Sequence, residues 1–196
     1  MLFASAATAA PPAADPAARR SLRARFRSGP LGRAIAKVDV RLYSLLREHG
    51  HDPAIELPIR RFSSLGEHAA VWLALGLAGA ALDAPRRPHW LRAARSVLVA
   101  YALNTVLKTV VRRKRPHMED WPALIATPTA LSFPSAHASS SFAAARAYSS
   151  LLPGEPLYAA AGAMALSRVY LGVHYPSDIA AGALLGTLVG SSGRAR

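Results

Sequence analysis

The chain of 196 residues is long enough for one domain, and it combines 52% hydrophobic residues with a formal net charge of +13. A soluble nucleic-acid-binding protein of this charge would be less apolar and would interleave its basic residues with aromatic ones, which this chain does not do. The absence of cysteine excludes thiol chemistry, disulfides and cysteine-ligated zinc. The composition therefore favours a small membrane protein whose basic flanks face anionic lipid, with no nucleic acid as partner.

The N-terminal region is predicted to consist of a tail and one amphipathic helix. Residues 1–30 are rich in Ala, Pro and Arg and predict a disordered tail, although the small residues at its start also resemble a processed signal segment. Five arginines within residues 19–27 form a basic arm suited to lipid headgroups. Residues 31–65 are predicted to hold an amphipathic helix and a linker, since apolar residues recur at helical spacing over 31–47. This helix either lies on the membrane surface or packs against the rest of the protein.

Five apolar segments follow within residues 66–196, which we expect to form one domain. They are predicted as helices near 66–83, 91–111, 138–152, 157–172 and 178–193. The first two approach the roughly 20 residues needed to cross a bilayer, whereas the last three are short and rich in Ala, Ser and Gly. Three glycines on one face of the last segment would let helices approach closely in lipid: Gly182, Gly186 and Gly190.

These segments predict an all-α fold, an integral membrane bundle of about five transmembrane helices plus the N-terminal amphipathic helix. A soluble alanine-rich bundle is the alternative. The glycine-lined last helix could pack within one chain or between chains, so a homo-oligomer is left open.

Three short segments that carry phosphate chemistry lie at the ends of these predicted helices. They are residues 108–116 (KTVVRRKRP), 134–137 (PSAH) and 167–178 (SRVYLGVHYPSD). With five spans, the loops after the second and fourth helices share one side of the membrane with the N-terminal region. The three segments should therefore meet at one membrane face.

The last segment holds a histidine and the carboxylate that can orient it. Asp178 falls in the first turn of a helix, where the helix dipole favours its anionic form. From there it can accept the Nδ1–H of His174 and leave Nε2 free as a nucleophile or base. Arg168 ends the preceding helix, where its planar guanidinium can hold two phosphate oxygens.

The other two segments add an anion site and further cations. Ser135 precedes a predicted helix whose free N–H groups could meet a phosphate, and its hydroxyl can cap that helix or donate to the anion. His137 lies in the first turn, where it could protonate a leaving oxygen. Lys108 and Arg115 lie two turns apart on roughly the same helix face, although this basic run also suits a plain membrane boundary.

Together the three segments resemble the signature of the type 2 phosphatidic acid phosphatase superfamily, which reads K-x6-RP, PSGH and SR-x5-H-x3-D. The resemblance covers roughly residues 66–193. One position departs from the pattern, because Ala136 stands where the family has glycine. Alanine still presents a backbone N–H but restricts φ, so we expect a tuned pocket.

The resemblance implies a metal-independent membrane phosphatase without cofactor, acting on a lipid-linked phosphate. It implies that His174 attacks phosphorus to form a phosphohistidine, that Asp178 orients it, and that His137 is the general acid. The phosphate-binding groups that it implies are Lys108, Arg115, Ser135, the backbone N–H of Ala136, and Arg168. The loop 117–133 is expected to shape the pocket around the rest of the substrate.

The substrate and the orientation are suggested by size and charge. The small size, the five-span layout and the Ala/Arg-rich composition resemble actinobacterial members of the family, which are proposed to dephosphorylate decaprenylphosphoryl-5-phosphoribose for cell-wall arabinan. Phosphatidic acid, phosphatidylglycerophosphate and polyprenyl pyrophosphate remain alternatives. Eleven Lys and Arg residues between positions 19 and 61 and four at 112–115 place the N-terminus and the site on the cytoplasmic face of the plasma membrane.

Two readings from other classes share part of this evidence. A vanadate-dependent haloperoxidase has the same phosphate pocket but is larger and soluble, whereas this chain has long apolar segments. A catalytically silent membrane scaffold would tolerate replacement of His174, which the phosphatase would not.

Overall fold

The computed structural model describes residues 29–194, and within them it contains seven α-helices and two 3₁₀ turns. The helices are α2 (Pro30–His49), α3 (Pro53–Ser64), α4 (Ala70–Leu82), α5 (Arg87–Val111), α6 (Ala136–Tyr148), α7 (Gly154–Tyr170) and α8 (Pro176–Ser191). The all-α prediction is confirmed, and α4 to α8 match the five predicted segments. The predicted tail and its basic arm lie outside the described residues, apart from residues 29 and 30.

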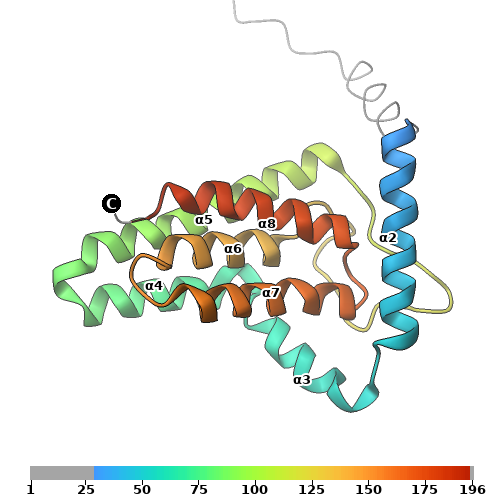
Figure 1. Cartoon of the computed structure of the whole chain (residues 1–196), viewed down its shortest axis with the longest axis horizontal. Helices are drawn as coiled ribbons and strands as arrows, with labels where there is room; N and C mark the ends of the chain where they lie inside the picture. The colour runs from blue at the N-terminus through green and yellow to red at the C-terminus, as the bar shows by residue number, and fades with distance from the viewer. Residues whose placement is uncertain (1–28, 195–196) are drawn as a thin grey trace, which may run out of the picture. The chain divides into compact units, whose positions relative to one another are not determined.

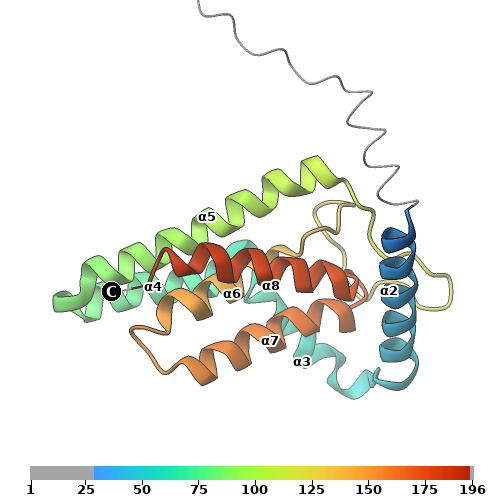
Figure 2. The same ribbon diagram turned by 45° about the horizontal axis from the view of Figure 1, so that its top comes forward.

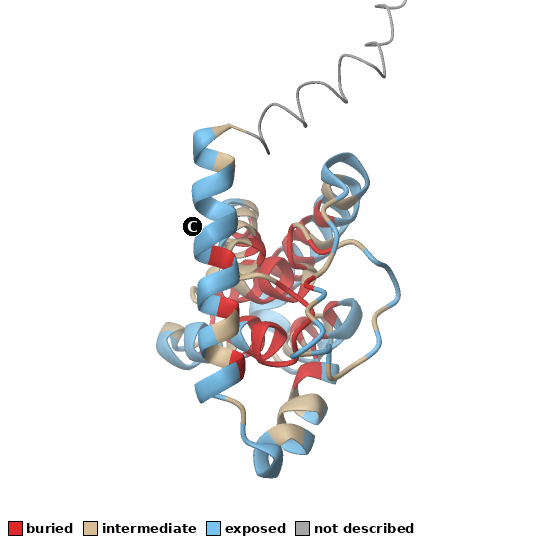
Figure 3. Cartoon of the chain, turned by 90° about the vertical axis from the view of Figure 1, so that its right-hand side faces the viewer, coloured by how far each residue is buried: buried red, intermediate tan, exposed pale blue. Residues whose placement is uncertain are grey.

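Residues from 37 onward form one compact unit, and residues 29–36, the first turns of α2, are a separate part. Within the larger unit, α4 to α8 run side by side, with α6 in the middle (Figures 1 and 2). Helix α6 packs against α5, α7 and α8, and the buried residues gather where these helices face one another (Figure 3). The unit extends further toward the N-terminus than the predicted 66–196 domain, and the predicted linker contains helix α3.

Helix α6 is almost entirely enclosed although it is rich in serine. Ten of its thirteen residues are buried. Its hydroxyls are satisfied by neighbours, because Ser139 accepts a hydrogen bond from the Asn104 amide at 2.9 Å and Ser141 accepts one from the Trp72 indole at 2.8 Å. Burial of paired polar groups costs little, so a helix of low hydropathy can occupy the centre of the bundle.

The glycine series of α8 has the packing role that its spacing predicts. A Cβ atom built at Gly182 would lie 2.6 Å from the Ser135 carbonyl oxygen, and one built at Gly190 would lie 2.5 Å from the Ala143 carbonyl oxygen. Both contacts are with the backbone of α6. Only a residue without a side chain allows α8 to approach α6 this closely.

The five predicted membrane spans are confirmed only in part. By length and composition, one helix of the described chain can cross a bilayer, residues 84–111, and the bent pair of residues 53–64 and 67–82 passes the same test together. Helices α6, α7 and α8 have 13, 17 and 16 residues, which at 1.5 Å per residue is about 20–26 Å, less than the roughly 30 Å of a hydrocarbon core. Their Ala, Ser and Gly content lowers their hydropathy further.

Helix α2 presents a polar stripe to the rest of its unit and an apolar face to the outside. Its buried residues are Asp39, Tyr43 and Arg47, spaced by four. The apolar side chains of Val38, Leu42 and Leu45 are instead 45–55% exposed. The helix therefore packs against the bundle through its polar side, as one interpretation of this amphipathic helix expects. Its exposed apolar side leaves the membrane-surface interpretation open.

Candidate active site

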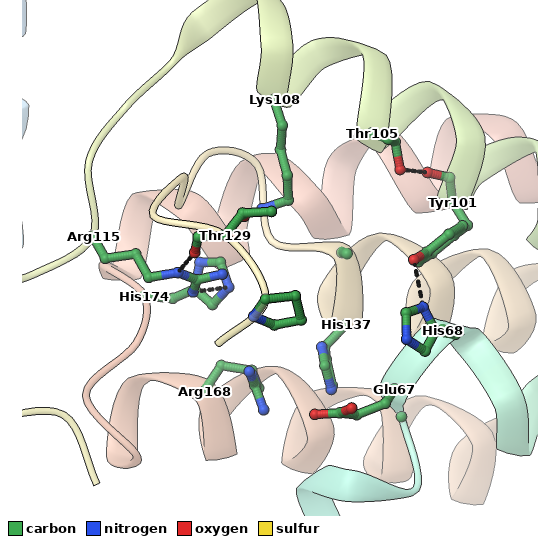
Figure 4. Close-up of a pocket in the computed structure, with 13 residues that line it drawn as sticks. Glu67, His68, Tyr101, Thr105, Lys108, Arg115, Thr129, His137, Arg168 and His174 are labelled. Carbon is green, nitrogen blue, oxygen red and sulfur yellow. Dashed lines mark hydrogen bonds between the residues drawn. The ribbon is translucent and has the colours of Figure 1, made fainter. Parts of the chain in front are cut away.

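The three signature segments meet at one pocket, as their predicted positions at helix ends require. The pocket, a cavity of about 170 Å³, is lined by residues from all three: Lys108, Arg115, Ala136, His137, Arg168 and His174 (Figure 4). They come from the end of α5 and the loop after it, the start of α6, the end of α7 and the loop before α8. The signature segments thus bring three cations and two imidazoles to this cavity, which is a set suited to a phosphate group.

The loop that follows α5 is folded back so that it holds Arg115 in place. Lys114 and Leu131 form an antiparallel bridge, and the Arg115 N–H donates to the Ala130 carbonyl at 3.2 Å. Near the end of α5, the Lys108 ammonium donates to the carbonyls of Leu131 and Ser132, each at 3.3 Å. The loop thus fixes both cations of the first segment at the pocket.

His174 is 2% exposed and lies between a cation and a carboxylate. Its Nε2 is 3.2 Å from Nη1 of Arg115, and its Nδ1 is 3.5 Å from Oδ2 of Asp178. Because guanidinium only donates, this geometry places the lone pair on Nε2 and the proton on Nδ1, facing the carboxylate at more than hydrogen-bond length. In this tautomer Nε2 is the ring atom that has a lone pair.

The surroundings of His174 favour its neutral form. Burial lowers the pKa of His174 well below its ordinary value of 6.5, and the neighbouring cations Arg115 and Lys108 lower it further. Burial also lowers the pKa of Arg115 to about 10, which still leaves its guanidinium charged at neutral pH. A neutral imidazole beside a permanent cation is the arrangement that attack on a phosphate dianion needs.

Behind His174, Asp178 belongs to a buried network that the sequence did not reveal. Arg113 donates to Oδ1 of Asp178 at 2.9 Å and to Oδ2 of Asp39 at 2.7 Å, and its guanidinium stacks over the Tyr175 ring. Asp39 also accepts hydrogen bonds from the Ser177 N–H and hydroxyl, at 2.8 and 2.6 Å. Helix α2 is thereby tied to the first turn of α8, which carries the carboxylate facing His174.

His137 and Arg168 share a partner on α3. The Ser63 hydroxyl accepts from Arg168 Nη1 at 2.6 Å, and the Ser63 carbonyl lies 3.1 Å from His137 Nε2. A carbonyl only accepts, so Nε2 of His137 carries a proton in this arrangement. Ser63 is 1% exposed and falls within the predicted linker, where no pattern distinguished it from other serines.

Ser135, like Asp178, is a predicted site residue that does not line the pocket. It is fully buried and caps α6, with its hydroxyl accepting from the Ala138 N–H at 3.5 Å. Its own N–H donates to the Asp178 carbonyl at 3.0 Å, which links the starts of α6 and α8. Of its two predicted roles, capping is the one seen in this geometry.

No group of three or more His, Asp or Glu side chains in residues 29–194 is arranged to hold a metal ion. The charged side chains at the pocket are mainly cations.

A helical bundle that brings two histidines and three cations to one pocket defines a phosphatase of lipid phosphates, and the comparisons agree. Residues 89–192 match the model of the PAP2 superfamily, and the chain belongs to this family. It is a PAP2-type lipid phosphate phosphatase, so the family suggested by the signature is confirmed.

Two related proteins share substantial sequence identity with this chain. The chain is 45% identical over 146 residues to the decaprenylphosphoryl-5-phosphoribose phosphatase of Mycobacterium tuberculosis, which covers 71% of this chain and 78% of the relative. It is 43% identical over 132 residues to the enzyme of the same name from Mycolicibacterium smegmatis, covering 66% of this chain and 72% of the relative.

Two solved structures share the fold at 22% identity. The first transmembrane PAP2-type phosphatidylglycerolphosphate phosphatase from Bacillus subtilis superposes with a TM-score of 0.67 and 89% coverage of both chains. LpxE from Aquifex aeolicus superposes with a TM-score of 0.63, covering 80% of this chain and 94% of that one. These matches establish the architecture and say nothing of the substrate.

Proposed function

We propose that the protein removes the 5-phosphate from decaprenylphosphoryl-5-phosphoribose, in the synthesis of a precursor for cell-wall arabinan. The observation that carries this proposal is the 43–45% identity, over 66–71% of the chain, to enzymes named for this reaction. The family match over residues 89–192 includes most of the phosphatase bundle. Phosphatidic acid, phosphatidylglycerophosphate and polyprenyl pyrophosphate are the alternative substrates.

The pocket supports a two-step mechanism. In the first step, Nε2 of His174 attacks phosphorus while the bond to the sugar oxygen breaks, and a phosphohistidine forms. The leaving oxygen takes a proton from His137, which acts in its imidazolium form, stabilised by the bound phosphate dianion. Charge developing on the phosphoryl oxygens is balanced by Lys108, Arg115 and Arg168, with the backbone N–H of Ala136 at the start of α6.

In the second step, water replaces the imidazole at phosphorus. His137, now deprotonated, accepts a proton from this water, the P–N bond breaks, and inorganic phosphate leaves. Asp178 stabilises the positive charge that His174 gains during attack, and the ion pair with Arg113 holds that carboxylate in place. Arg115 donates to Nε2 in the present geometry, so it must turn toward the phosphate oxygens before attack.

The membrane location supports a lipid substrate. The fold is that of transmembrane PAP2 enzymes, and exposed apolar side chains such as Leu98, Leu103 and Val106 cover the outer surface of α5. We place the protein in the plasma membrane with about five spans. The Lys/Arg distribution supports a cytoplasmic site, with the amphipathic part of residues 31–65 on the same face and the catalytic bundle within 66–196.

This orientation can be measured with single cysteines, since the chain has none of its own. Glu119→Cys lies in the exposed loop on the site side, and Glu155→Cys lies at the start of α7 on the opposite end. An impermeant maleimide should label only Glu155→Cys in intact cells and both after lysis. Labelling of Glu119→Cys in intact cells would overturn the cytoplasmic placement.

The substrate is tested by phosphate release from the protein purified in detergent. Decaprenylphosphoryl-5-phosphoribose, phosphatidic acid and a polyprenyl pyrophosphate are compared at equal surface concentration, with His174→Gln as the inactive control. We expect the highest kcat/KM for the phosphoribosyl lipid. A higher kcat/KM for either other lipid would overturn the proposed substrate without contradicting the mechanism. Preference for phosphatidic acid would indicate a role in phospholipid synthesis, and preference for the pyrophosphate would indicate a role in carrier recycling.

A further inference from the structure

The pocket has a second wall whose chemistry differs from the phosphate-binding wall. Beside the signature residues, the cavity is also lined by Glu67, His68, Tyr101 and Thr105 (Figure 4). They come from the 3₁₀ turn before α4 and from the middle of α5. None of the roles assigned to the phosphatase mechanism uses these residues.

The backbone of this wall adopts a conformation that L-residues rarely take. His68 has φ 52° and Ala69 has φ 60°, both in the left-handed region although neither is glycine. Such residues persist where the surrounding structure enforces them, and they cluster at ligand sites. The preceding Gly66 lies so close to the site that an added Cβ would be 2.7 Å from Cδ2 of His137.

Within this wall, the side chains are ordered against one another. His68 Nδ1 is 2.9 Å from the Tyr101 hydroxyl, and their rings meet edge to face at a centroid distance of 6.1 Å. Tyr101 in turn lies one turn before Thr105 on α5, with the Thr105 hydroxyl bonded to the Tyr101 carbonyl at 3.0 Å. The wall therefore offers a fixed imidazole and phenol beside the cavity.

Glu67 is an unusual residue for a phosphate pocket. Its carboxylate points toward Arg168 and His137 (Figure 4), and it acts on Arg168 through its charge, without a hydrogen bond to it among the described residues. An ionised carboxylate only accepts hydrogen bonds and repels other anions. On this wall it favours a substrate that places O–H donors next to its phosphate and disfavours one that places a second anion there.

The candidate lipids differ in this respect. Phosphatidic acid presents ester oxygens beside its phosphate, which only accept, and a polyprenyl pyrophosphate presents a second phosphate bonded directly to the first. Phosphatidylglycerophosphate presents one hydroxyl beside its phosphate. A 5-phosphoribosyl lipid carries its second phosphate, the prenyl diester, across the ribose ring, and it presents two neighbouring hydroxyls, which can donate to both oxygens of one carboxylate; in nucleotide sites an acidic residue binds ribose through such a hydroxyl. Among these lipids, only the ribose offers a pair of hydroxyls to the carboxylate.

We propose that Glu67, with Tyr101 and His68, forms a hydroxyl subsite that binds the ribose 2- and 3-hydroxyls and selects a phosphorylated sugar over other lipid phosphates. This inference rests on the proposed function, because it assigns the specificity of the same site. Glu67 accepts from the two hydroxyls, and Tyr101, fixed by His68, contacts the sugar from the α5 side. The subsite positions the 5-phosphate at His174.

The test compares two substrates on variants of the purified full chain. Glu67→Ala removes the carboxylate, Tyr101→Phe removes the phenol oxygen, and Glu155→Ala is a control with the same charge change at the far end of the bundle. Thermal unfolding confirms that each variant is folded. The quantity measured is the ratio of kcat/KM for the phosphoribosyl lipid to kcat/KM for phosphatidic acid.

We expect Glu67→Ala to lower this ratio by about 10- to 100-fold, the range for losing hydrogen bonds to a charged group, with phosphatidic acid hydrolysis unchanged or faster. Glu155→Ala should leave the ratio at its wild-type value. An analogue lacking the 2- and 3-hydroxyls should be a poor substrate for the wild type and should show no further loss with Glu67→Ala.

The outcomes separate the two claims. If the wild type prefers the phosphoribosyl lipid but the ratio is the same in Glu67→Ala and Glu155→Ala, the hydroxyl subsite is overturned and the proposed function stands. If the wild type itself does not hydrolyse the phosphoribosyl lipid, the proposed function is overturned, and the subsite with it.

Discussion

Replacing Gly186 by alanine tests the packing of α8 against α6, the two helices whose first turns carry Asp178 and His137. A Cβ at this position would overlap the Ser139 carbonyl oxygen and lie 2.8 Å from the Ala143 nitrogen, whereas ordinary Cβ contacts begin near 3.4 Å. Both obstacles are backbone atoms of α6, so no side-chain rotation relieves them. Helices α6 and α8 must therefore move apart.

The size of the effect follows from two opposing terms. Overpacking of this kind costs about 1–3 kcal/mol or more, and alanine returns up to about 1 kcal/mol of helix propensity over glycine. Because both obstacles are backbone atoms, we take the upper end of the overpacking cost, about 3 kcal/mol, and expect a net loss of about 2 kcal/mol. For a chain of this size that lowers Tm by about 4–8 °C. Activity should fall as well, because the first turns of α6 and α8 carry His137 and Asp178.

The assay is thermal unfolding in detergent, followed by the fluorescence of the buried Trp72 and Trp90, with phosphate release measured in parallel. Gly162→Ala on α7 is the matched control, since a Cβ there meets nothing within 4 Å. It should leave Tm unchanged or raise it slightly. The reasoning is refuted if Gly186→Ala is as stable and active as Gly162→Ala.

Three further predictions concern the network behind the site, His174 and helix α2. Asp39→Ala leaves the partly buried guanidinium of Arg113 without one of its two carboxylates, so we expect the free energy of unfolding to fall by about 2–3 kcal/mol and kcat to fall as well. A Tm within 1 °C of wild type would contradict this. Because the pKa of His174 is lowered in the folded chain, the unfolded chain binds this proton first as pH falls below 6.5, and the free energy of unfolding should rise with pH up to about 6.5. The His174→Gln variant should lose this part of the pH dependence. An unchanged pH dependence in that variant would contradict the lowered pKa. The emission of an environment-sensitive dye attached to Leu42→Cys should shift to the blue on reconstitution into anionic vesicles, and the same dye on Arg41→Cys should shift less. Equal shifts would exclude a membrane-facing apolar side of α2.

The sequence was sufficient for the parts of the site that depend on helix ends. The cations and histidines that line the pocket stand at the ends of periodic apolar segments, so helix order alone predicted that they meet. The glycine series was equally readable, because a repeat of four residues on a helix marks a close-packed face. The position of Ser135 was predicted with two roles, of which the N-cap is the one the structure shows.

The residues that sequence reasoning missed are those whose role depends on tertiary contacts. Ser63 and Asp39 lie in ordinary helical surroundings, and only the folded chain brings them to Arg168 and Arg113. Glu67 lies at a helix boundary, where a carboxylate is common. The number of membrane spans could not be predicted from hydropathy. Helix α6 is short and rich in serine, yet it is buried because its hydroxyls are paired, and hydropathy takes no account of such pairing.

The measurement that tests the central claim most directly is detection of the phosphoryl group on His174. The purified enzyme is mixed with lipid labelled in the 5-phosphate and quenched in alkali within milliseconds to seconds, since a P–N bond survives alkali and is lost in acid. The account predicts label on the peptide that contains His174, its loss on acid treatment, and no label and no phosphate release in a folded His174→Gln variant. Label on a different residue, or phosphate release that persists in His174→Gln, would contradict it.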